Sequence, residues 1–370
     1  MFSARLKVLQ KMLRDRNAQA FFITNPVHIF YCTGFVGLVP TERESTLLVT
    51  VEDIFLYVPA MYETQARACS TVQGGLVQLS VARERDGLLK LFAADVAQHS
   101  SILFESNNLS VAEWKRMENY AQLRLVPEDG FLENMRLLKD QQELEVLRTA
   151  VRIGDEVFQD TVHFLQRNNY TQLFEFDIAQ MLLTFGRKRG ADSFSFDPIV
   201  AVGSGSAEPH YFTGAKKLQK GLPLLLDFGF RYKGYCSDLT RTVYLGKASE
   251  RFRQMYGFVL ASNQVGISSC KSHVTTRSVY DAANRVFQEQ RLEKHFIHGL
   301  GHGIGLQVHE PPYARADMDT VLAPGMTLTI EPGLYFEKEF GIRIEDLTVI
   351  TSNGCEVLST RSEKHLIEII

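Results

Sequence analysis

The chain has 370 residues, which is long enough for two domains of ordinary size. Apolar residues make up 45% of it and charged residues 22%, a composition typical of globular proteins rather than disordered or fibrous ones. The formal net charge of -3 gives no overall basic field, so the composition does not indicate a nucleic-acid partner.

The cysteines and the hydropathy pattern indicate in which cellular compartment the protein resides. The five cysteines are odd in number, widely spaced and free of any CxxC pair, which predicts free thiols in a reducing compartment. The N-terminal segment carries charges throughout and lacks the apolar core of a signal peptide. No uncharged apolar run approaches the roughly 18 residues typical of a membrane span. We therefore expect a cytoplasmic protein with no membrane partner.

Helical and strand-like patterns alternate in the first part of the chain. An amphipathic helix over 3–17 precedes a buried strand at 20–24 and a strand pair at 46–51 and 54–58. Helical turns near 62–69, 85–97 and 111–121 then alternate with strands near 76–80 and 101–104. This alternation predicts an α/β domain over 1–126. A turn cluster at 127–130 opens an expected linker over 127–139, so the second domain is expected over 140–370.

The second domain opens with long helical patterns. Asp140 and Glu143 have the spacing of a capping box at the start of the first pattern, and a second helix is expected over 171–188.

The stretch 224–244 has two apolar runs around a short polar centre, the pattern of a β-hairpin. If Tyr232 and Lys233 form the loop, Asp227 lies directly opposite Asp238. If Lys233 and Gly234 form it, the register shifts and the two aspartates lie diagonally. Directly opposed carboxylates either share a proton or hold a cation between them.

Residues 295–312, HFIHGLGHGIGLQVHEPP, combine four of the ten histidines with four glycines. A regular helix here would be costly, because each glycine in a helix interior costs about 1 kcal/mol. We therefore predict a glycine-rich loop or strand whose backbone passes close to a ligand, with His302 presented into a cavity.

A second hairpin is expected between the strand-like segments 326–331 and 341–345. Pairing centred on Lys338 would oppose Glu331 to Glu345, and carboxylates among apolar residues must be paired or protonated. Together with the two aspartates and His302, these residues make an oxygen-rich set with one imidazole, which suits Mn²⁺, Co²⁺, Fe²⁺ or Zn²⁺. Two such ions about 3.5–4 Å apart form an apparatus for metal-assisted hydrolysis of a carbonyl group.

The motifs DFG-x8-D-x-TRT, HGLGHGIGL-x2-HE, EPG and GIRIED stand in this order in the chain. They resemble those of the metallopeptidases with the pita-bread fold, in the branch of Xaa-Pro aminopeptidase (aminopeptidase P) and Xaa-Pro dipeptidase (prolidase). The resemblance covers almost the whole chain and is most specific over 195–346. It implies an α/β creatinase-like N-terminal domain, an α+β pita-bread catalytic domain with a curved antiparallel sheet, and a homodimer.

The resemblance also assigns roles to residues of this chain. It implies a pair of divalent ions, with Mn²⁺ expected first and Co²⁺, Zn²⁺ or Fe²⁺ as alternatives. The implied metal ligands are Asp227, Asp238, His302, Glu331 and Glu345. The implied catalytic residues are Glu331 as proton shuttle, His309 and His210; the residues expected to line the substrate site are His210, His298, His309 and Arg343. For Arg343 we favour an ion pair that orients a metal-binding carboxylate. Direct contact with the substrate is the less favoured alternative.

The implied activity is hydrolysis of the N-terminal Xaa-Pro bond with release of the first residue. Some dipeptidases of the family have an arginine shortly after the HE dipeptide, suited to binding a free carboxylate, but Tyr313 follows here. We therefore expect an aminopeptidase ahead of a strict dipeptidase, although another basic residue could substitute. Metal-free amidinohydrolases and non-enzymatic binding modules of the same fold lose several ligand positions, and this chain keeps all five.

Overall fold

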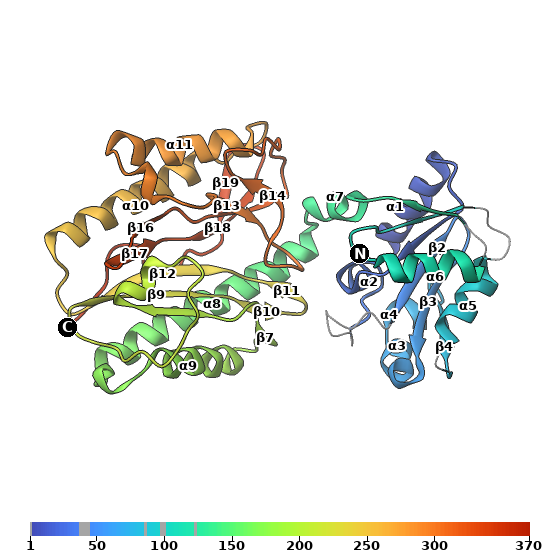
Figure 1. Cartoon of the computed structure of the whole chain (residues 1–370), viewed down its shortest axis with the longest axis horizontal. Coiled ribbons are helices and arrows are strands. Elements are labelled where there is room, and N and C mark those ends of the chain that lie inside the picture. The colour runs from blue at the N-terminus through green and yellow to red at the C-terminus, as the bar shows by residue number, and fades with distance from the viewer. Residues whose placement is uncertain (1, 37–44, 85–86, 97–100, 122–123) are drawn as a thin grey trace. The chain divides into compact units, whose positions relative to one another are not determined.

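The computed structural model describes residues 2–36, 45–84, 87–96, 101–121 and 124–370 (Figure 1). The chain divides into two compact units, Met1–Leu132 and Glu133–Ile370. The division falls inside the stretch 127–139 that was expected as a linker, and this stretch contains the helix α7 (Phe131–Leu137). The domain bounds given above stay predictions. In the described part of the chain, no helix is both long and apolar enough to cross a membrane.

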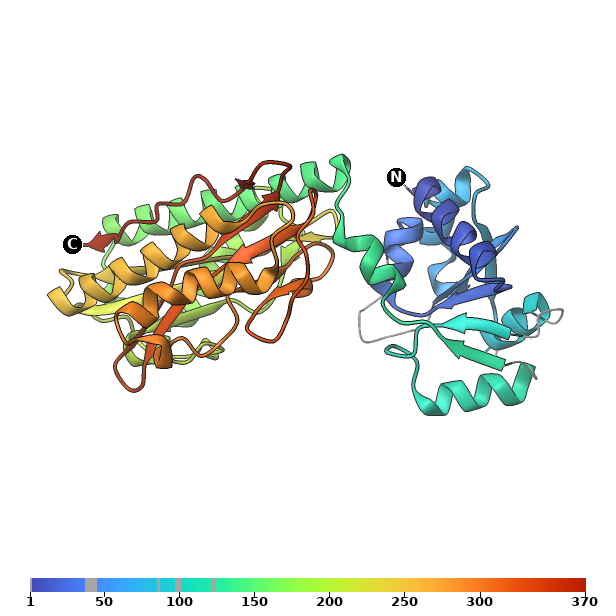
Figure 2. The same ribbon diagram turned by 90° about the horizontal axis from the view of Figure 1, so that it is seen from above.

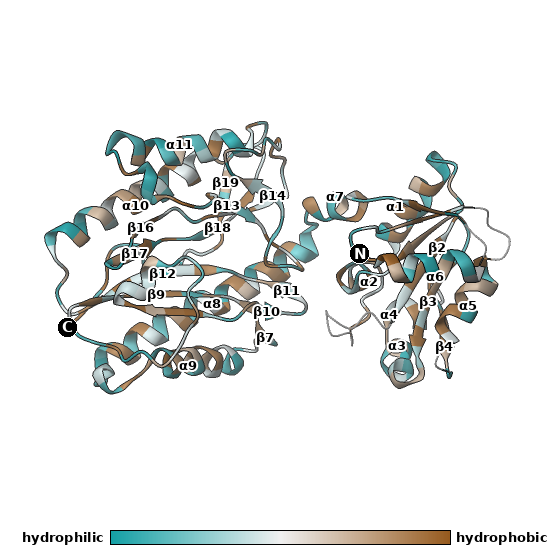
Figure 3. Ribbon diagram, viewed as in Figure 1, coloured by the Kyte–Doolittle hydropathy of each residue, from teal (hydrophilic) through white to brown (hydrophobic). Residues whose placement is uncertain are grey.

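The N-terminal unit is a mixed sheet covered by helices on both faces (Figure 2). Its strands lie in the order β4-β3-β2-β1-β5-β6, and β1 pairs antiparallel with β2 but parallel with β5. The strands are β1 (Ala20–Ile23), β2 (Thr46–Thr50), β3 (Ile54–Pro59), β4 (Gln78–Ala82), β5 (Ser101–Phe104) and β6 (Arg124–Pro127). The helices are α1 (Phe2–Asp15), α2 (Pro26–Thr33), α3 (Glu63–Arg67), α4 (Ser70–Gln73), α5 (Gly87–Val96) and α6 (Val111–Ala121). The central strands β1, β2 and β3 carry mostly hydrophobic, buried residues, whereas the edge strands β4 and β6 are largely part-exposed (Figure 3).

The C-terminal unit is built from antiparallel ladders, with one parallel pair between β12 and β20. Its strands are β7 (Ser193–Phe194), β8 (Ile199–Val202), β9 (Leu222–Phe228), β10 (Phe230–Tyr232), β11 (Tyr235–Cys236), β12 (Leu239–Leu245), β13 (Gly301–Gly303), β14 (Glu310–Ala314), β15 (Thr327–Ile330), β16 (Gly333–Phe336), β17 (Phe340–Arg343), β18 (Asp346–Ile350), β19 (Cys355–Val357) and β20 (Glu368–Ile369). Its longer helices are α8 (Gln141–Arg167), α9 (Glu175–Lys188), α10 (Glu250–Ser269) and α11 (Thr276–Glu289). The last two were not predicted from the sequence.

Two hydrophobic cores hold this unit together. Helices α8 and α9 pack their apolar faces on the sheet of β8, β9 and β12, and α10 and α11 pack against β15, β16 and β17. Helix α8 begins with the predicted capping box, in which the Glu143 amide donates to Asp140 Oδ1 at 2.9 Å and the Asp140 amide donates to Glu143 Oε2 at 2.9 Å. Each half of the unit thus presents strands that are supported from behind by helices.

The first hairpin, formed by β10 and β11, has the register that follows from a Lys233-Gly234 loop. Tyr232 pairs with Tyr235, so Lys233 and Gly234 form the two-residue turn, and both have positive φ values of 47° and 85°. Asp227 consequently pairs with Thr240. Of the two registers that the sequence left open, the one with Asp227 directly opposite Asp238 is not formed, because a glycine accepts the left-handed turn conformation more readily than the tyrosine of the other loop would.

The second hairpin has the predicted register but is interrupted. Gly333 pairs with Arg343 on one side of the two glutamates, and Ile330 pairs with Asp346 on the other. Glu331 and Glu345 therefore lie across from each other in the gap between two ladders. The gap follows from Pro332, which has no backbone N–H to donate to a continuous ladder.

Candidate active site

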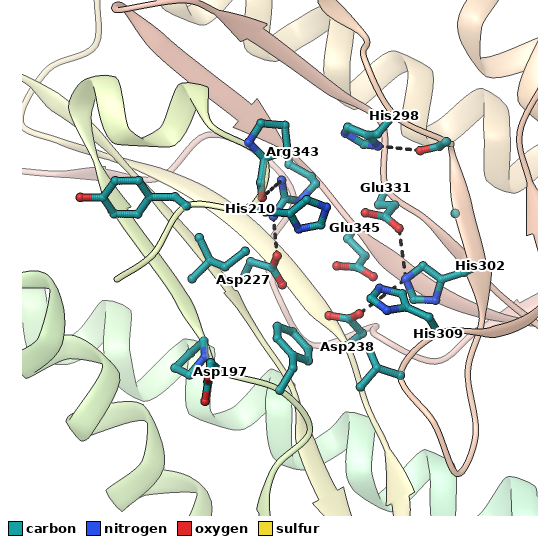
Figure 4. A pocket seen from close by; sticks show the side chains of 18 of the residues that line it. Asp197, His210, Asp227, Asp238, His298, His302, His309, Glu331, Arg343 and Glu345 are labelled. Atoms are coloured by element: carbon teal, nitrogen blue, oxygen red, sulfur yellow. Dashed lines mark hydrogen bonds and ion pairs between the residues drawn. The ribbon is translucent and has the colours of Figure 1, made fainter. Parts of the chain in front are cut away.

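A cavity of about 840 Å³ in the C-terminal unit is lined by all nine residues that the sequence assigned to the site (Figure 4). They come from strands and loops far apart in the chain: Asp227, Asp238, His302, Glu331, Glu345, His210, His298, His309 and Arg343. The glycine-rich histidine segment contains the short strand β13, which carries His302, in agreement with the prediction of a strand or loop. Folding therefore brings the whole predicted set to one place.

The two hairpins that carry the carboxylates are joined edge to edge by hydrogen bonds. The Glu345 amide donates to the Thr240 carbonyl at 3.1 Å, and the Thr240 hydroxyl donates to Glu345 Oε2 at 2.8 Å. Asp238 precedes β12 by one residue and Asp227 lies near the end of β9, so this junction places the two aspartates beside Glu345.

Strand β13 approaches β15 closely because both positions at the contact are small. A Cβ atom on Gly301 would lie 1.8 Å from the Thr329 carbonyl oxygen, a distance that no side chain tolerates. The Thr329 hydroxyl accepts a hydrogen bond from the His302 amide at 2.9 Å. The glycine thus allows the backbone approach that aims His302 at the carboxylates.

Four carboxylates and the His302 ring converge at one end of the cavity (Figure 4). His302 Nε2 lies 3.2 Å from Glu331 Oε1 and 3.7 Å from Asp238 Oδ2. Among the described residues, Asp238, His302 and Glu345 form a group that could hold a metal ion, because their ligand atoms all lie within 4.8 Å of one another. Asp238 Oδ1 and Glu345 Oε1 are buried oxygens without a hydrogen-bond donor. Buried acceptors without a donor fit a cation, so the residues present suit a divalent metal.

The electrostatics of the cluster support the same interpretation. Burial, followed by the charges of neighbouring carboxylates, raises the pKa of Asp238 and of Glu345 well above the usual range. Burial also raises the pKa of Asp227, although the Arg343 charge acts in the opposite direction. Burial would raise the pKa of Glu331, but the hydrogen bond from His302 together with the charges of His302, His298 and Arg343 lowers it to about 2. One arginine cannot neutralise four carboxylates, and a bound cation would remove the remaining repulsion.

Arg343 lies behind the carboxylates rather than in the open cavity. It is 3% exposed, its Nη2 donates to Asp227 Oδ2, and its Nε donates to Thr240 Oγ1 at 3.2 Å. Its Nη1 donates to the hydroxyl of Tyr335 at 2.7 Å. These contacts agree with the ion pair that was favoured for Arg343 from the sequence.

Tyr335 is a residue that the sequence analysis missed. Its hydroxyl, besides accepting from Arg343, lies 2.9 Å from His298 Nε2, so it connects the arginine to the histidine segment. Burial raises the pKa of this phenol to about 12, which keeps it protonated and able to donate. The available signal was its position opposite Gly341, because a glycine across from a buried aromatic residue leaves room for the ring.

Two further histidines complete the polar wall. The ring of His309 lies 4.3 Å from that of His302 in an edge-to-face arrangement, and burial lowers the pKa of His309. Burial also lowers the pKa of His298. Both ring nitrogens of His298 already have protein partners, at the Gly299 carbonyl and the Tyr335 hydroxyl, whereas a neutral His309 ring can donate to a carbonyl oxygen in the cavity.

The remaining wall of the cavity is largely aromatic. Phe176, Phe196, Tyr211 and Phe212 line it, and Tyr313 and Arg315 lie at the histidine segment. The guanidinium group of Arg315 lies 5.6 Å from the centre of the Tyr313 ring. A pocket with an apolar wall, a few directed polar groups and an acidic end suits a small peptide with a free amine.

Comparison with known proteins identifies the family. Residues 145–352 match the metallopeptidase family M24, and residues 5–138 match the creatinase/prolidase N-terminal domain. An Xaa-Pro dipeptidase from Pyrococcus furiosus is 29% identical over 98% of this chain and 99% of its own length. A solved Xaa-Pro dipeptidase from Bacillus anthracis is 30% identical, with 100% of both chains covered and a TM-score of 0.91. An X-Pro aminopeptidase from Thermotoga maritima is 30% identical over 95% of this chain and 97% of its own, with a TM-score of 0.85.

The fold and the family match thus define a peptidase of the metallopeptidase class. The chain belongs to metallopeptidase family M24, with a creatinase-like N-terminal domain followed by a pita-bread catalytic domain. The family, the fold class and the peptidase class expected from the sequence are confirmed. Membership of this family implies the use of a divalent metal ion.

Proposed function

We propose that the protein hydrolyses the bond between an N-terminal residue and a following proline. The observation that carries this proposal is the convergence of Asp227, Asp238, His302, Glu331 and Glu345 at one end of a peptide-sized cavity, with two buried oxygens left without donors. These five residues would hold two divalent ions, with Mn²⁺ the first candidate. When bound, such ions lower the pKa of a water molecule so that it can act as nucleophile, and they polarise the substrate carbonyl.

The side chains around the cluster have separate tasks in this proposal. His309 and His210 donate hydrogen bonds to the carbonyl oxygen as it gains negative charge, which stabilises the transition state. The Glu331 carboxylate accepts the proton of the nucleophile and returns it to the prolyl nitrogen, which leaves as an amine. Arg343 holds Asp227 in position.

Proline as the second residue follows from the same arrangement. The nitrogen of an Xaa-Pro bond carries no hydrogen, so a peptidase that needs this N–H as a donor is disfavoured. A site that acts on the carbonyl oxygen has no such need. The free amine of the first residue is attracted to the acidic end of the cavity.

The length of the substrate is a separate question with two candidate answers. The sequence favoured an aminopeptidase, because Tyr313 occupies the position of a carboxylate-binding arginine. Arg315 lines the cavity two residues later, so a cation is present that can bind the carboxylate of a free Xaa-Pro dipeptide. Several relatives are named Xaa-Pro dipeptidases, which supports a dipeptidase at least as well as an aminopeptidase. We therefore propose free Xaa-Pro dipeptides as the first candidate substrate. Longer peptides are the second candidate, because the cavity is large enough to hold them.

The test compares Ala-Pro with Ala-Pro-Ala, using metal-stripped protein with and without added Mn²⁺. We expect metal-dependent cleavage of both, with Ala-Pro faster. The variant Arg315→Gln should raise KM about tenfold for Ala-Pro and leave Ala-Pro-Ala nearly unchanged, because only the dipeptide places its carboxylate there. The exposed variant Arg285→Gln serves as the matched control. Failure to cleave either peptide with metal shown to be bound would refute the proposed function.

The oligomeric state and the cellular location are also proposals. The homodimer, the cytoplasmic location and the absence of a nucleic-acid partner stay predictions from the sequence.

A further inference from the structure

Two cysteines that are widely spaced in the sequence lie together in the catalytic unit. Cys270 follows the last residue of α10, and Cys355 is the first residue of β19. The carbonyl oxygen of Ile267 accepts from the Cys270 amide at 3.1 Å and from Cys355 Sγ at 3.3 Å. The Cys270 amide and the Cys355 thiol thus share one backbone acceptor, which places the two residues side by side. The proposed chemistry of the active site uses neither of them.

The two thiols differ in exposure and in acidity. Cys270 is 1% exposed, whereas Cys355 is only half buried. The hydrogen bond from Cys270 lowers the pKa of the Cys355 thiol, and the charge of Lys364 acts in the same direction. The same hydrogen bond and burial raise the pKa of Cys270. Cys355 is therefore the thiol that a reagent from solution reaches first and the one with more thiolate character.

We propose that Cys270 and Cys355 form a reversible disulfide when the protein meets a small disulfide oxidant such as oxidised glutathione. The Cys355 thiolate attacks one sulfur of the oxidant, which forms a mixed disulfide and releases one glutathione thiol. Cys270 then loses its proton and attacks the Cys355 sulfur, which forms the protein disulfide and releases the second glutathione thiol. Two electrons and two protons pass from the protein thiols to the two released thiols, so the step is balanced.

The cross-link would secure the part of the chain that carries most of the site. It closes residues 271–354 into a loop that includes His302, Glu331 and Glu345. Helix α10 is already bonded to this part, because Asn263 Nδ2 donates to the Ile330 carbonyl at 2.9 Å and lies 3.4 Å from the Ile344 carbonyl oxygen. These carbonyls directly precede the two glutamates. Fixing the end of α10 to β19 therefore restrains the backbone that positions them.

The expected effect is greater thermal stability with little change in turnover. A disulfide restricts the unfolded chain more when it closes a long loop, which for this loop predicts a rise of about 5–10 °C in Tm. The active-site side chains do not move in this proposal, so kcat/KM should stay within about twofold of the reduced protein.

The experiment counts thiols in the full-length, metal-loaded protein after incubation with oxidised glutathione or with dithiothreitol. Under denaturing conditions we expect five free thiols in the reduced protein and three in the oxidised protein. Peptide mass spectrometry should find Cys270 joined to Cys355, and dithiothreitol should restore both thiols and the lower Tm. A wild-type protein that keeps five thiols, or that retains glutathione on Cys355, would overturn the proposal.

Two variants keep the test specific. Cys355→Ser should prevent both the cross-link and the rise in Tm, whereas Cys69→Ser, which removes a half-buried thiol in the other unit, should leave both intact. Cys270→Ala provides a second disruption of the pair if Cys355→Ser proves unstable. Because the readouts are thiol counts and Tm, the result does not depend on whether the proposed peptidase activity is correct.

Discussion

The buried oxygens Asp238 Oδ1 and Glu345 Oε1 mark where positive charge is missing from the cavity. Protein groups bind other oxygens of the cluster. Arg343 donates a hydrogen bond to Asp227, and the Thr240 hydroxyl donates one to the second oxygen of Glu345. At the scale of single residues, the cluster therefore has the chemistry to hold a cation, and protein groups already orient its outer carboxylate oxygens.

Replacing Asp238 by Asn tests this assignment. The amide keeps the shape of the side chain but removes its charge, so we expect metal affinity to fall and Ala-Pro hydrolysis to drop at least about 100-fold. The Tm measured without metal should stay the same or rise, because one of several repelling carboxylates is removed. Asp281→Asn, on the exposed face of α11, is the control. Wild-type turnover in Asp238→Asn would contradict the ligand assignment.

At the scale of elements, the position of β13 decides where His302 points. The strand fits only because Gly301 has no side chain next to the Thr329 carbonyl. A backbone contact of this kind leaves no flexible atom that could move aside.

We therefore predict that Gly301→Ala lowers the free energy of unfolding by about 1–3 kcal/mol and weakens metal binding. Urea unfolding and metal titration would measure the two effects. Gly257→Ala is the matched control, because its Cβ meets nothing within 4 Å and an alanine in helix α10 should stabilise by up to about 1 kcal/mol. Equal stability of the two variants would show that β13 can shift freely.

A buried ion cluster holds the other end of the histidine segment. Glu310, the first residue of β14, pairs with Arg136 and with Lys139, and all three side chains are almost fully buried. Burial alone would raise the pKa of Glu310, but the charges of Lys139 and Arg136 lower it overall. The cluster thus ties β14 to the segment that precedes α8.

Glu310→Gln should destabilise the protein by about 3–5 kcal/mol at neutral pH, because it leaves two buried cations without an anion. A lowered pKa in the folded state means that the ionised carboxylate stabilises the protein above its unfolded pKa of about 4.3 and that this stability is lost as the pH falls through the folded value. The difference between wild type and variant should therefore shrink below about pH 4. Glu356→Gln, in a surface pair with Arg148, should cost less than about 1 kcal/mol. A difference that does not change between pH 7 and pH 3 would contradict the ion-pair account.

At the scale of the whole molecule, the catalytic unit combines two helix-backed halves whose carboxylates meet at one cluster. A metal that binds only the folded state stabilises it by mass action. At a free Mn²⁺ concentration about 100 times its Kd, the gain is about 2.7 kcal/mol, which corresponds to roughly 5–10 °C in Tm.

We predict that chelation lowers the Tm by this amount and that added Mn²⁺ restores it. Differential scanning calorimetry, with bound metal measured by atomic emission, tests this prediction. The Asp238→Asn variant should show a smaller shift under the same conditions. A Tm that does not respond although metal is shown to bind would mean that the cluster does not link the two halves.

The sequence predicted the residues of the site, partly because the acidic residues stand at paired positions of two hairpins and partly because the motifs resemble those of a known family. It also predicted the capping box of α8, a loop or strand at His302 and the register of the second hairpin, since each depends on a few neighbouring residues. The sequence left the turn of the first hairpin open between two adjacent loops, because these loops differ only in which residues adopt positive φ.

Only the tertiary structure decided which distant residues meet. Tyr335 joins His298 to Arg343, Glu310 meets its two cations, and Cys270 meets Cys355 through contacts between elements that no local pattern records. The physical reason is that burial and pairing depend on how the helices and ladders pack, which is a property of the whole chain rather than of any segment.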